Sequence, residues 1–387
     1  MRRFFRNISW VFPLLGGVIA FTLYFLIKYI PYGVDIKIHN FYLVEYLEKG
    51  HFPIPPGYYA LIYLLDLFFR FKYPFVLSSI LVLTFFLLWK FSILRNWISS
   101  KPGLPRGWGD LLALGLMFFG PWVAPWIETD FWYLGKFTPT IWHNSTLIVS
   151  LPFSLLLFRE TLKWWENETK SSLWKILLFG LLILLIKPSF LFCFVPLFPW
   201  FTGKLKGFSS LAFRFSLGIA LGLLIGIAVE KFLIYSWDPM VVEEYPLAEQ
   251  PQIQIQPFKV WLHYAFEPVW DFISSFMLSI TFLILWGKSP FSRASFSFSF
   301  SLLILSLILF LTLSESGFRE WHANFYWQIP IALLIHCWAM LDFVLDFQGE
   351  KGKKLHWKTK VFGIIFGLHV LFGLAYWGRF FVERIIS

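Results

Sequence analysis

Long uninterrupted runs of apolar residues divide this sequence of 387 residues from one end to the other. Nine are full length, at residues 10–30, 74–94, 109–126, 141–158, 211–235, 268–286, 296–313, 325–345 and 358–378. A helix of about 20 such residues crosses the hydrocarbon core of a bilayer. Because 58% of the residues are hydrophobic and only 14% are charged, lipid must be the solvent. The sequence therefore predicts an all-α polytopic membrane protein and excludes soluble enzymes, collagen and disulfide scaffolds.

Two further apolar stretches do not fit a simple count of spans. Residues 56–69 form too short a helix to cross a bilayer, which predicts a re-entrant or interfacial helix. Residues 173–201 are too long for one span and are interrupted at Lys187 and Pro188, which predicts a hairpin of two short helices. The expected fold is a single transmembrane domain over 1–387 with about eleven transmembrane helices.

The basic residues predict the orientation of these spans. Arg2, Arg3 and Arg6 precede the first span, which has no small-residue cleavage site after it and reads as a retained signal anchor. With 56–69 kept out of the span count, 21 of the 33 lysines and arginines fall on the side of the N-terminus. We expect a protein of the cytoplasmic membrane with its N-terminus inside and its C-terminus outside. Orientation then explains the net charge of +10, so no nucleic-acid partner is expected.

Candidate functional residues gather in the loops of the outer face. Residues 31–70 are expected to hold interfacial or re-entrant helices, with Asp35 and His39 on one face of the first. Residues 237–267 form the longest external loop. The other candidates, from this loop and its neighbours, are Glu128, Asp130, His143, Asn144, Glu243, Glu244, Arg319 and His322.

The segment from the first span to residue 65 resembles the integral-membrane GT-C glycosyltransferases. A signal-anchor span, an early acid in the first external loop and the sequence Pro53-Ile54-Pro55-Pro56-Gly57-Tyr58-Tyr59 leading back toward the membrane carry the resemblance. It implies transfer of a sugar from a polyprenyl-phosphate donor to an acceptor at the outer face, with Asp35 as the catalytic acid. It also implies that Lys187 and Arg319 bind the lipid phosphate. Asp35 stands alone, without a second acid beside it, and the sequence predicts no soluble C-terminal domain after the spans.

Each candidate also has a purely structural interpretation. Asp35 is a preferred residue type for the N-cap of a helix, and His39 either orients Asp35 or lies on the wet face. Lys187 is also placed for snorkelling to the interface, and Arg319 for pairing with Glu315 or Glu320.

Glu128 and Asp130 compete as a second acid for the acceptor or for a divalent ion. Packing explains His143 and Asn144 as readily as catalysis does, and Glu243 and Glu244 lie on a polar, solvated loop. Cys193 and Cys337 lie within apolar runs, so no disulfide is expected.

The sequence thus predicts an inverting membrane glycosyltransferase that takes its sugar from a polyprenyl-phosphate donor. The acceptor, whether glycan, lipid or protein, is left open. No cofactor is required, no metal ligands are assigned, and a divalent cation is possible. The alternatives are a transporter or flippase of a lipid-linked saccharide and a non-catalytic subunit of envelope-polysaccharide assembly.

Overall fold

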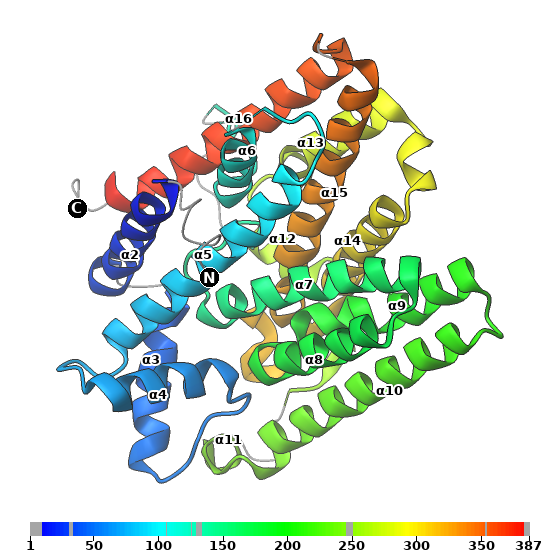
Figure 1. Ribbon diagram of the computed structural model, residues 1–387. Coiled ribbons are helices and arrows are strands. Elements are labelled where there is room, and N and C mark those ends of the chain that lie inside the picture. Colours follow the sequence, from blue (N-terminus) through cyan, green and yellow to red (C-terminus); the bar gives the residue numbers. More distant parts are fainter. Residues whose placement is uncertain are drawn as a thin grey trace.

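A bundle of packed helices makes up most of the protein, as the computed structural model in Figure 1 shows. The structure describes residues 10–30, 34–105, 107–124, 126–128, 134–244, 251–352 and 354–382. Within these ranges eight helices are long and apolar enough to cross a membrane. They are α2 (Val11–Tyr29), α5 (Val76–Ser99), α7 (Ser145–Asn167), α10 (Leu211–Phe232, extended by a π-helical turn to Trp237), α13 (Pro268–Trp286), α14 (Ala294–Thr312), α15 (Gln328–Lys351) and α16 (Trp357–Val382). The predicted all-α class is confirmed, and these helices agree with a polytopic membrane protein.

Shorter helices complete the described part of the chain. The apolar ones and the helix of the first loop are α3 (Asp35–Glu48), α4 (Gly57–Phe69), α6 (Trp108–Met117), α8 (Lys170–Ile186) and α9 (Leu191–Lys206). The remaining elements are α11 (Pro239–Glu244), α12 (Lys259–Tyr264) and the 3₁₀ turns η1 (Pro188–Phe190), η4 (Ser289–Ser292), η5 (Gly317–His322) and η6 (Asn324–Tyr326). The count of about eleven spans depends on how these short helices meet the bilayer, so it stays a prediction.

The apolar run 109–126 does not form one full-length helix. Helix α6 ends at Met117, and the chain continues in non-helical conformation over residues 119–124. Its glycine Gly120 lies so close to Gly373 of α16 that a Cβ on Gly120 would meet the Gly373 Cα at 2.8 Å. His369 of α16 supports this segment, with its Nδ1 2.6 Å from the Gly120 carbonyl and its Nε2 accepting from the Leu278 amide. The contact with Nδ1 satisfies the Gly120 carbonyl, which a continued helix would have paired within itself.

The chain from residue 134 to residue 144 is entirely buried, although the sequence suggests an external loop there. Lys136 holds it in the interior through two ion pairs, 3.0 Å to Glu128 and 3.1 Å to Asp271. Its ammonium also donates to the Ser274 hydroxyl at 2.9 Å. A buried cation is stable only when paired and hydrogen-bonded, so the acids that surround Lys136 explain why this polar segment lies inside the protein.

The hairpin of α8 and α9 reverses direction at the residues that the sequence singled out. Helix α8 ends at Ile186, Lys187 adopts an extended conformation, and Pro188 begins the η1 turn that leads into α9. Gly57, at the start of α4, packs against this turn; a Cβ there would lie 2.6 Å from the Leu185 carbonyl oxygen. The Pro-Pro-Gly-Tyr segment and the hairpin tip are therefore neighbours in space.

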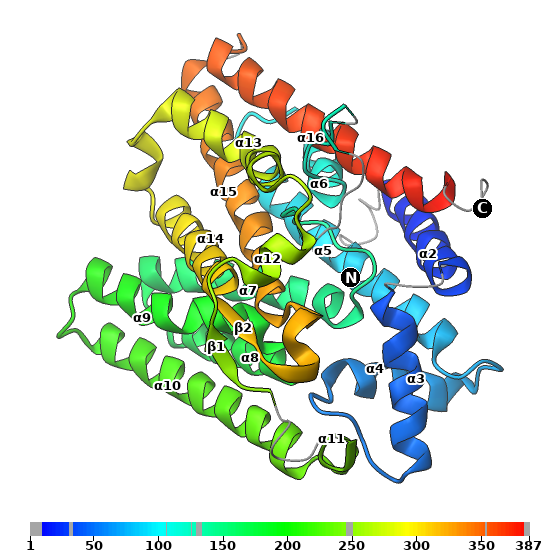
Figure 2. The same cartoon turned by 180° about the vertical axis from the view of Figure 1, so that it is seen from behind.

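A small antiparallel sheet lies at the same end of the molecule as α3, α4 and α11 (Figure 2). Strand β1 (Ile253–Ile255) pairs with β2 (Leu313–Glu315) in the register that places Gln254 opposite Ser314. The pairing brings the long segment after α11 against the turn that follows α14. It thereby joins two stretches of the chain that sequence order separates by about 60 residues.

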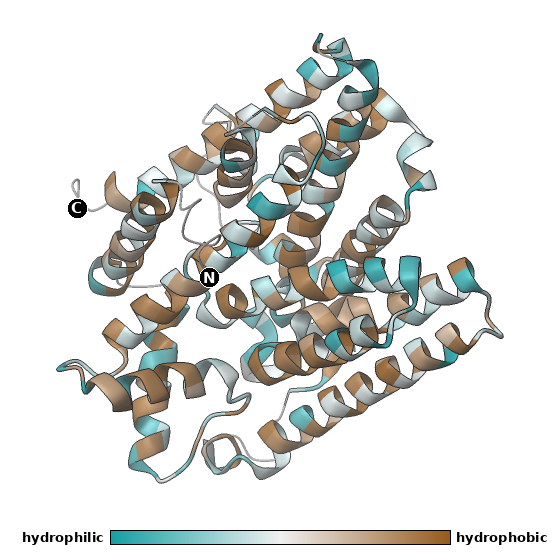
Figure 3. Ribbon diagram, in the orientation of Figure 1, coloured by the Kyte–Doolittle hydropathy of each residue, from teal (hydrophilic) through white to brown (hydrophobic). Residues whose placement is uncertain are grey.

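Hydrophobic residues cover most of the length of α10, whereas hydrophilic residues concentrate at helix ends and in the connections (Figure 3). Only 11% of the apolar stretch of α10 is buried within the protein. The corresponding share is 89% for the segment Arg319–Lys351, which contains α15. Helix α10 is thus a peripheral helix with most of its apolar surface facing outward, and α15 is the central one.

Candidate functional site

A cavity of about 1430 Å³ opens between α3, the hairpin tip, α9, α10 and the turns that precede α15. It takes in five of the residues singled out from the sequence for binding or catalysis, among them His39, Lys187, Arg319 and His322. His39 lies on α3, Lys187 at the hairpin tip, and Arg319 and His322 on η5, so the fold brings them together over long distances in sequence. Glu243 also lines the cavity, on the side of α11.

Asp35 lies beside this cavity at the start of α3. Its side chain does not cap the helix, since the N-cap is Val34 and no side-chain capping bond is made there. The Asp35 Oδ2 atom instead accepts a hydrogen bond of 2.6 Å from the Asn144 side-chain amide. The bond fixes the carboxylate against the first turn of α7 and leaves its other oxygen for a different partner.

Asn144 is the residue that relates Asp35 to the cavity. It is the N-cap of α7, where its Oδ1 accepts from the Leu147 amide at 2.9 Å and from the Thr146 hydroxyl at 3.2 Å. The Thr146 hydroxyl in turn accepts from the Lys187 ammonium at 3.2 Å. A continuous chain of hydrogen bonds therefore runs from Asp35 through Asn144 and Thr146 to Lys187.

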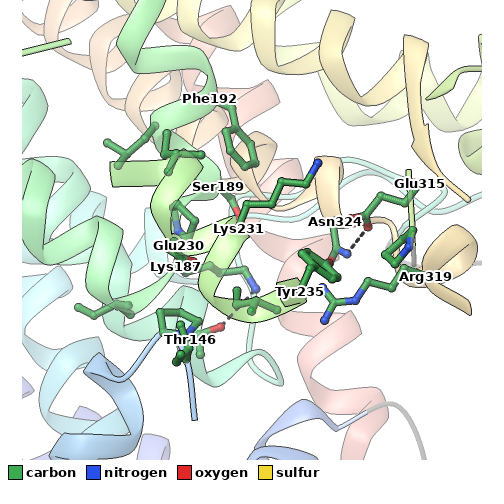
Figure 4. Close-up of a pocket in the computed structure, with 18 of the residues that line it drawn as sticks. Thr146, Lys187, Ser189, Phe192, Glu230, Lys231, Tyr235, Glu315, Arg319 and Asn324 are labelled. Carbon is green, nitrogen blue, oxygen red and sulfur yellow. Dashed lines mark hydrogen bonds between the residues drawn. The ribbon is translucent and has the colours of Figure 1, made fainter. Parts of the chain in front are cut away.

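Lys187 points into the cavity toward Thr146 (Figure 4). Its ammonium lies 5.2 Å from the centre of the Trp327 ring, a cation–π contact. Burial lowers the pKa of Lys187 to about 8, while the Asp35 and Glu230 carboxylates act in the opposite direction. The lysine lies outside all eight candidate spanning helices and is still largely protonated at neutral pH. It can offer a positive charge to an anion in the cavity.

Arg319 faces the same space from the turn η5. Its guanidinium carbon lies 5.0 Å from the centre of the Tyr235 ring, and Figure 4 shows the side chain directed toward that ring. The acids that flank Arg319 in the sequence have other partners: Glu320 pairs with Lys259, and Glu315 accepts from the Asn324 amide. Arg319 and Lys187 therefore place two cations on one cavity, although 131 residues separate them in the sequence.

His39 lies on the wall of the cavity nearest Asp35. Its Nδ1 is hydrogen-bonded to the Tyr59 hydroxyl of α4, 2.5 Å away. Burial lowers the pKa of His39 to about 4, with the Asp35 carboxylate opposing that effect. The ring is therefore neutral at neutral pH and carries one proton on its two nitrogens.

Helices α3 and α4 are fastened to the bundle by buried polar contacts. The Tyr58 hydroxyl donates to Ser79 of α5 at 2.9 Å, and the Ser79 hydroxyl donates to the Asn40 side chain of α3 at 2.6 Å. Neighbouring tyrosines of the segment Gly57-Tyr58-Tyr59 thus hold α3 at two points, through Asn40 and through His39. This arrangement positions the helix that carries Asp35.

An apolar section of the cavity extends from the cations between α9 and α10. Residues of both helices line it, among them Phe192, Val195, Pro199, Leu217, Leu221 and Leu224. The lining residues of α10 reach from Leu217 to Ile227, which is about 15 Å along the helix axis at the usual rise. The cavity therefore joins a cationic end to an elongated apolar end.

The other candidates have different surroundings. Glu128 is buried beside Lys136 and accepts from the Trp270 indole, and it does not line the cavity. His143 is buried against the Trp327 ring, and burial lowers its pKa while the Asp35 carboxylate opposes that effect. Asp130 lies outside the described residues. Glu244 ends α11, and its side chain is also outside the described part.

Several residues of the site were not among those singled out from the sequence. Thr146 and Tyr59 hold Lys187 and His39, and Glu230, Lys231 and Tyr235 bring polar groups of α10 into the cavity. The adjacent Glu230 and Lys231 near the end of an otherwise apolar helix were a usable signal, because charged residues at such positions tend to face a cavity or a partner.

Within the described ranges, no group of three or more His, Cys, Asp or Glu side chains is placed to hold a metal ion. A scan against protein-family models and a search of curated proteins find no match to this chain. The case for a function therefore depends on the cavity and on the residues around it.

Proposed function

We propose that the protein is a membrane glycosyltransferase of the GT-C type that moves a sugar from a polyprenyl-phosphate donor to an acceptor at the non-cytoplasmic face. The apolar section between α9 and α10 suits one long hydrocarbon chain, because its walls offer no polar partners that such a chain would leave unsatisfied. Lys187 and Arg319, at the end of that section, supply positive charge for the phosphate.

Asp35 is the proposed general base. Its carboxylate takes the proton of an acceptor hydroxyl as the hydroxyl oxygen attacks the anomeric carbon of the donor sugar. The bond from that carbon to the phosphate oxygen breaks, and its electron pair stays on the phosphate. One such displacement inverts the anomeric configuration. Lys187 and Arg319 stabilise the reaction because the phosphate gains negative charge as it leaves.

The distribution of ion pairs supports the proposed orientation in a cytoplasmic membrane. Lys101 pairs with Asp342 and Asp346 at the ends of α5 and α15 opposite to α3, and Lys206 pairs with Glu168 at the corresponding end of the hairpin. This end carries most of the basic loops, which by the positive-inside rule belong to the cytoplasm. The cavity, α3 and the β1–β2 sheet then belong to the outer side.

The observation that carries the proposal is the hydrogen-bonded chain from Asp35 to Lys187, which ties the proposed base to the proposed phosphate ligand. The test is sugar transfer by purified protein from a polyprenyl-phosphate sugar, comparing Asp35→Asn with the unaltered chain. We expect turnover to fall by roughly 10²- to 10⁴-fold while donor binding persists.

Glu48→Gln, on the same helix but outside the cavity lining, is the matched control. Turnover of Asp35→Asn equal to that of the control excludes Asp35 as the base. Movement of the donor across the bilayer without sugar transfer favours the flippase alternative.

A further inference from the structure

The outer section of the cavity differs in chemistry from the apolar section between α9 and α10. One wall is a single face of α3, on which His39, Tyr42, Tyr46 and Lys49 follow one another at intervals of three or four residues. Glu45 lines the cavity from the same helix. This row of residues covers about 15 Å of the helix axis. The outer section is therefore long, polar and aromatic.

The wall opposite α3 comes from the corner between α10 and α11. Asp238 and Glu243 line it, and the Tyr46 hydroxyl donates a hydrogen bond of 2.8 Å to the Asp238 Oδ2 atom across the cavity. Burial, followed by the bond to Asp238, raises the pKa of Tyr46, so this hydroxyl stays neutral and keeps its proton. The bond holds the two walls at a fixed separation. Figure 1 shows α3 and α11 at the same end of the molecule.

These side chains suit a saccharide better than a hydrocarbon chain or an anion. Tyr42 is 45% exposed while it lines the cavity, and an exposed aromatic face offers a platform for the C–H groups of a sugar ring. Glu45 and Glu243 offer carboxylates that accept hydrogen bonds from hydroxyl groups. A hydrocarbon chain would leave these groups without partners.

The charges on the two walls narrow the class of saccharide. Glu45, Asp238 and Glu243 bring negative charge, and Lys49 brings one positive charge that lies 3.8 Å from Glu45. The excess of carboxylates disfavours uronic acids and phosphorylated sugars, because like charges repel at short range. The Arg319 guanidinium also acts on this section, since it opposes the rise in the pKa of Tyr46, but the three carboxylates still outnumber the two cations Lys49 and Arg319. Lys187 lies next to the apolar section.

We propose that the outer section between α3 and α11 is the acceptor subsite and that it binds a saccharide without acidic groups. The proposal rests on the proposed function, since an acceptor has meaning only if sugar transfer occurs. It makes the acceptor a neutral glycan, presented by its hydroxyl groups, in place of a protein or an anionic lipid. The two substrates then approach Asp35 from different sections of one cavity.

The test is saturation-transfer NMR on the full chain in nanodiscs of neutral lipid. The probes are neutral trisaccharides of glucose, xylose and N-acetylglucosamine, with trigalacturonic acid as the acidic comparison. We expect a saturation-transfer signal, which reports binding, from at least one neutral trisaccharide and none from trigalacturonic acid. Tyr42→Ala and Glu45→Gln should weaken binding of that trisaccharide by roughly fivefold to a hundredfold. Tyr73→Ala and Glu48→Gln, which alter exposed residues outside the cavity lining, should leave it unchanged.

Three outcomes overturn the proposal. They are no saturation-transfer signal from any neutral trisaccharide, a stronger signal from trigalacturonic acid, or trisaccharide binding that Tyr42→Ala and Glu45→Gln leave intact. Asp35→Asn separates this result from the proposed function, because Asp35 is not one of the residues that form the outer section. Saccharide binding that persists while Asp35→Asn retains full turnover removes the assigned base and keeps the subsite. Loss of turnover in Asp35→Asn without any saccharide binding removes the subsite and keeps the base.

Discussion

Asn144 donates a hydrogen bond of 2.6 Å to Asp35, across 109 residues of sequence. The same side chain caps helix α7 by accepting from the Leu147 amide. Asn144 therefore has two separable roles, one in orienting a carboxylate and one in capping the N-terminus of α7. A single substitution distinguishes them when the new residue is able to cap a helix but is too short to reach Asp35.

Asn144→Ser is the substitution that makes this distinction. Serine caps helices about as well as asparagine, so the stability of α7 should be kept, whereas Asn144→Ala should lose about 1 kcal/mol. Both variants lose the bond to Asp35, and we expect turnover to fall by roughly 10- to 100-fold in each. Thermal unfolding and the rate of sugar transfer are the two measurements. Full turnover in Asn144→Ser contradicts the orienting role.

Lys187 predicts a pH dependence of donor binding. Its pKa of about 8 means that the ammonium loses its proton as the pH rises through 8. Binding of an anionic phosphodiester favours the charged form, so affinity should be highest below pH 8 and should fall above it, approaching about tenfold per pH unit. Lys187→Arg keeps its charge over this range and should remove the dependence. Equal slopes in the two proteins between pH 7 and pH 9 would contradict a phosphate role for Lys187.

Gly57 predicts a steric effect at the hairpin tip. A Cβ at this position meets the Leu185 carbonyl and the Ile186 side chain at 2.6 Å, and the backbone atom cannot move without shifting α8. Gly57→Ala should lower the free energy of unfolding by about 1–3 kcal/mol and weaken donor binding through Lys187. Gly17→Ala is the matched control, because a Cβ on this helical glycine meets no packing neighbour within 4 Å; it should be neutral or slightly stabilising. The measurement is the thermal unfolding midpoint of each of the two variants in detergent. Equal midpoints for Gly57→Ala and Gly17→Ala would show that the contact between Gly57 and the hairpin tip is not tight.

Lys136, which does not line the cavity, predicts a large loss of stability when it is replaced. Lys136→Met leaves Glu128 and Asp271 buried without their cation, which should cost about 3–5 kcal/mol. Lys163→Met removes a half-exposed partner of Glu160 and should cost less than about 1 kcal/mol. Denaturant unfolding of the two variants in the same detergent is the measurement. Similar losses in both would mean that the buried acids find other partners.

The hairpin at Lys187 shows what local sequence rules can predict. Proline lacks an amide proton and disfavours helix at the preceding residue, so a break at Lys187 and Pro188 followed from local stereochemistry. The helices expected within residues 31–70 are found as α3 and α4. These features depend on residues that are neighbours in the chain.

The segment after Met117 shows where such rules fail. Its composition is as apolar as that of a spanning helix, yet the close contact of Gly120 with Gly373 and the bonds to His369 hold it in a non-helical conformation. The burial of 134–144 depends in the same way on Asp271, more than 120 residues away. The link from Asp35 to Asn144 is also of this kind, so the relation between the candidate acid and α7 had no local signal.

The peripheral position of α10 bears on how the proposed lipid donor would meet the protein. Because this helix forms one wall of the cavity and turns most of its apolar surface outward, we expect the donor to reach the apolar section by diffusing within the plane of the bilayer. The quantity that governs saturation is then the mole fraction of the donor among the surrounding lipids. Kinetic constants measured at different ratios of detergent or lipid to protein become comparable only after they are expressed on that two-dimensional scale.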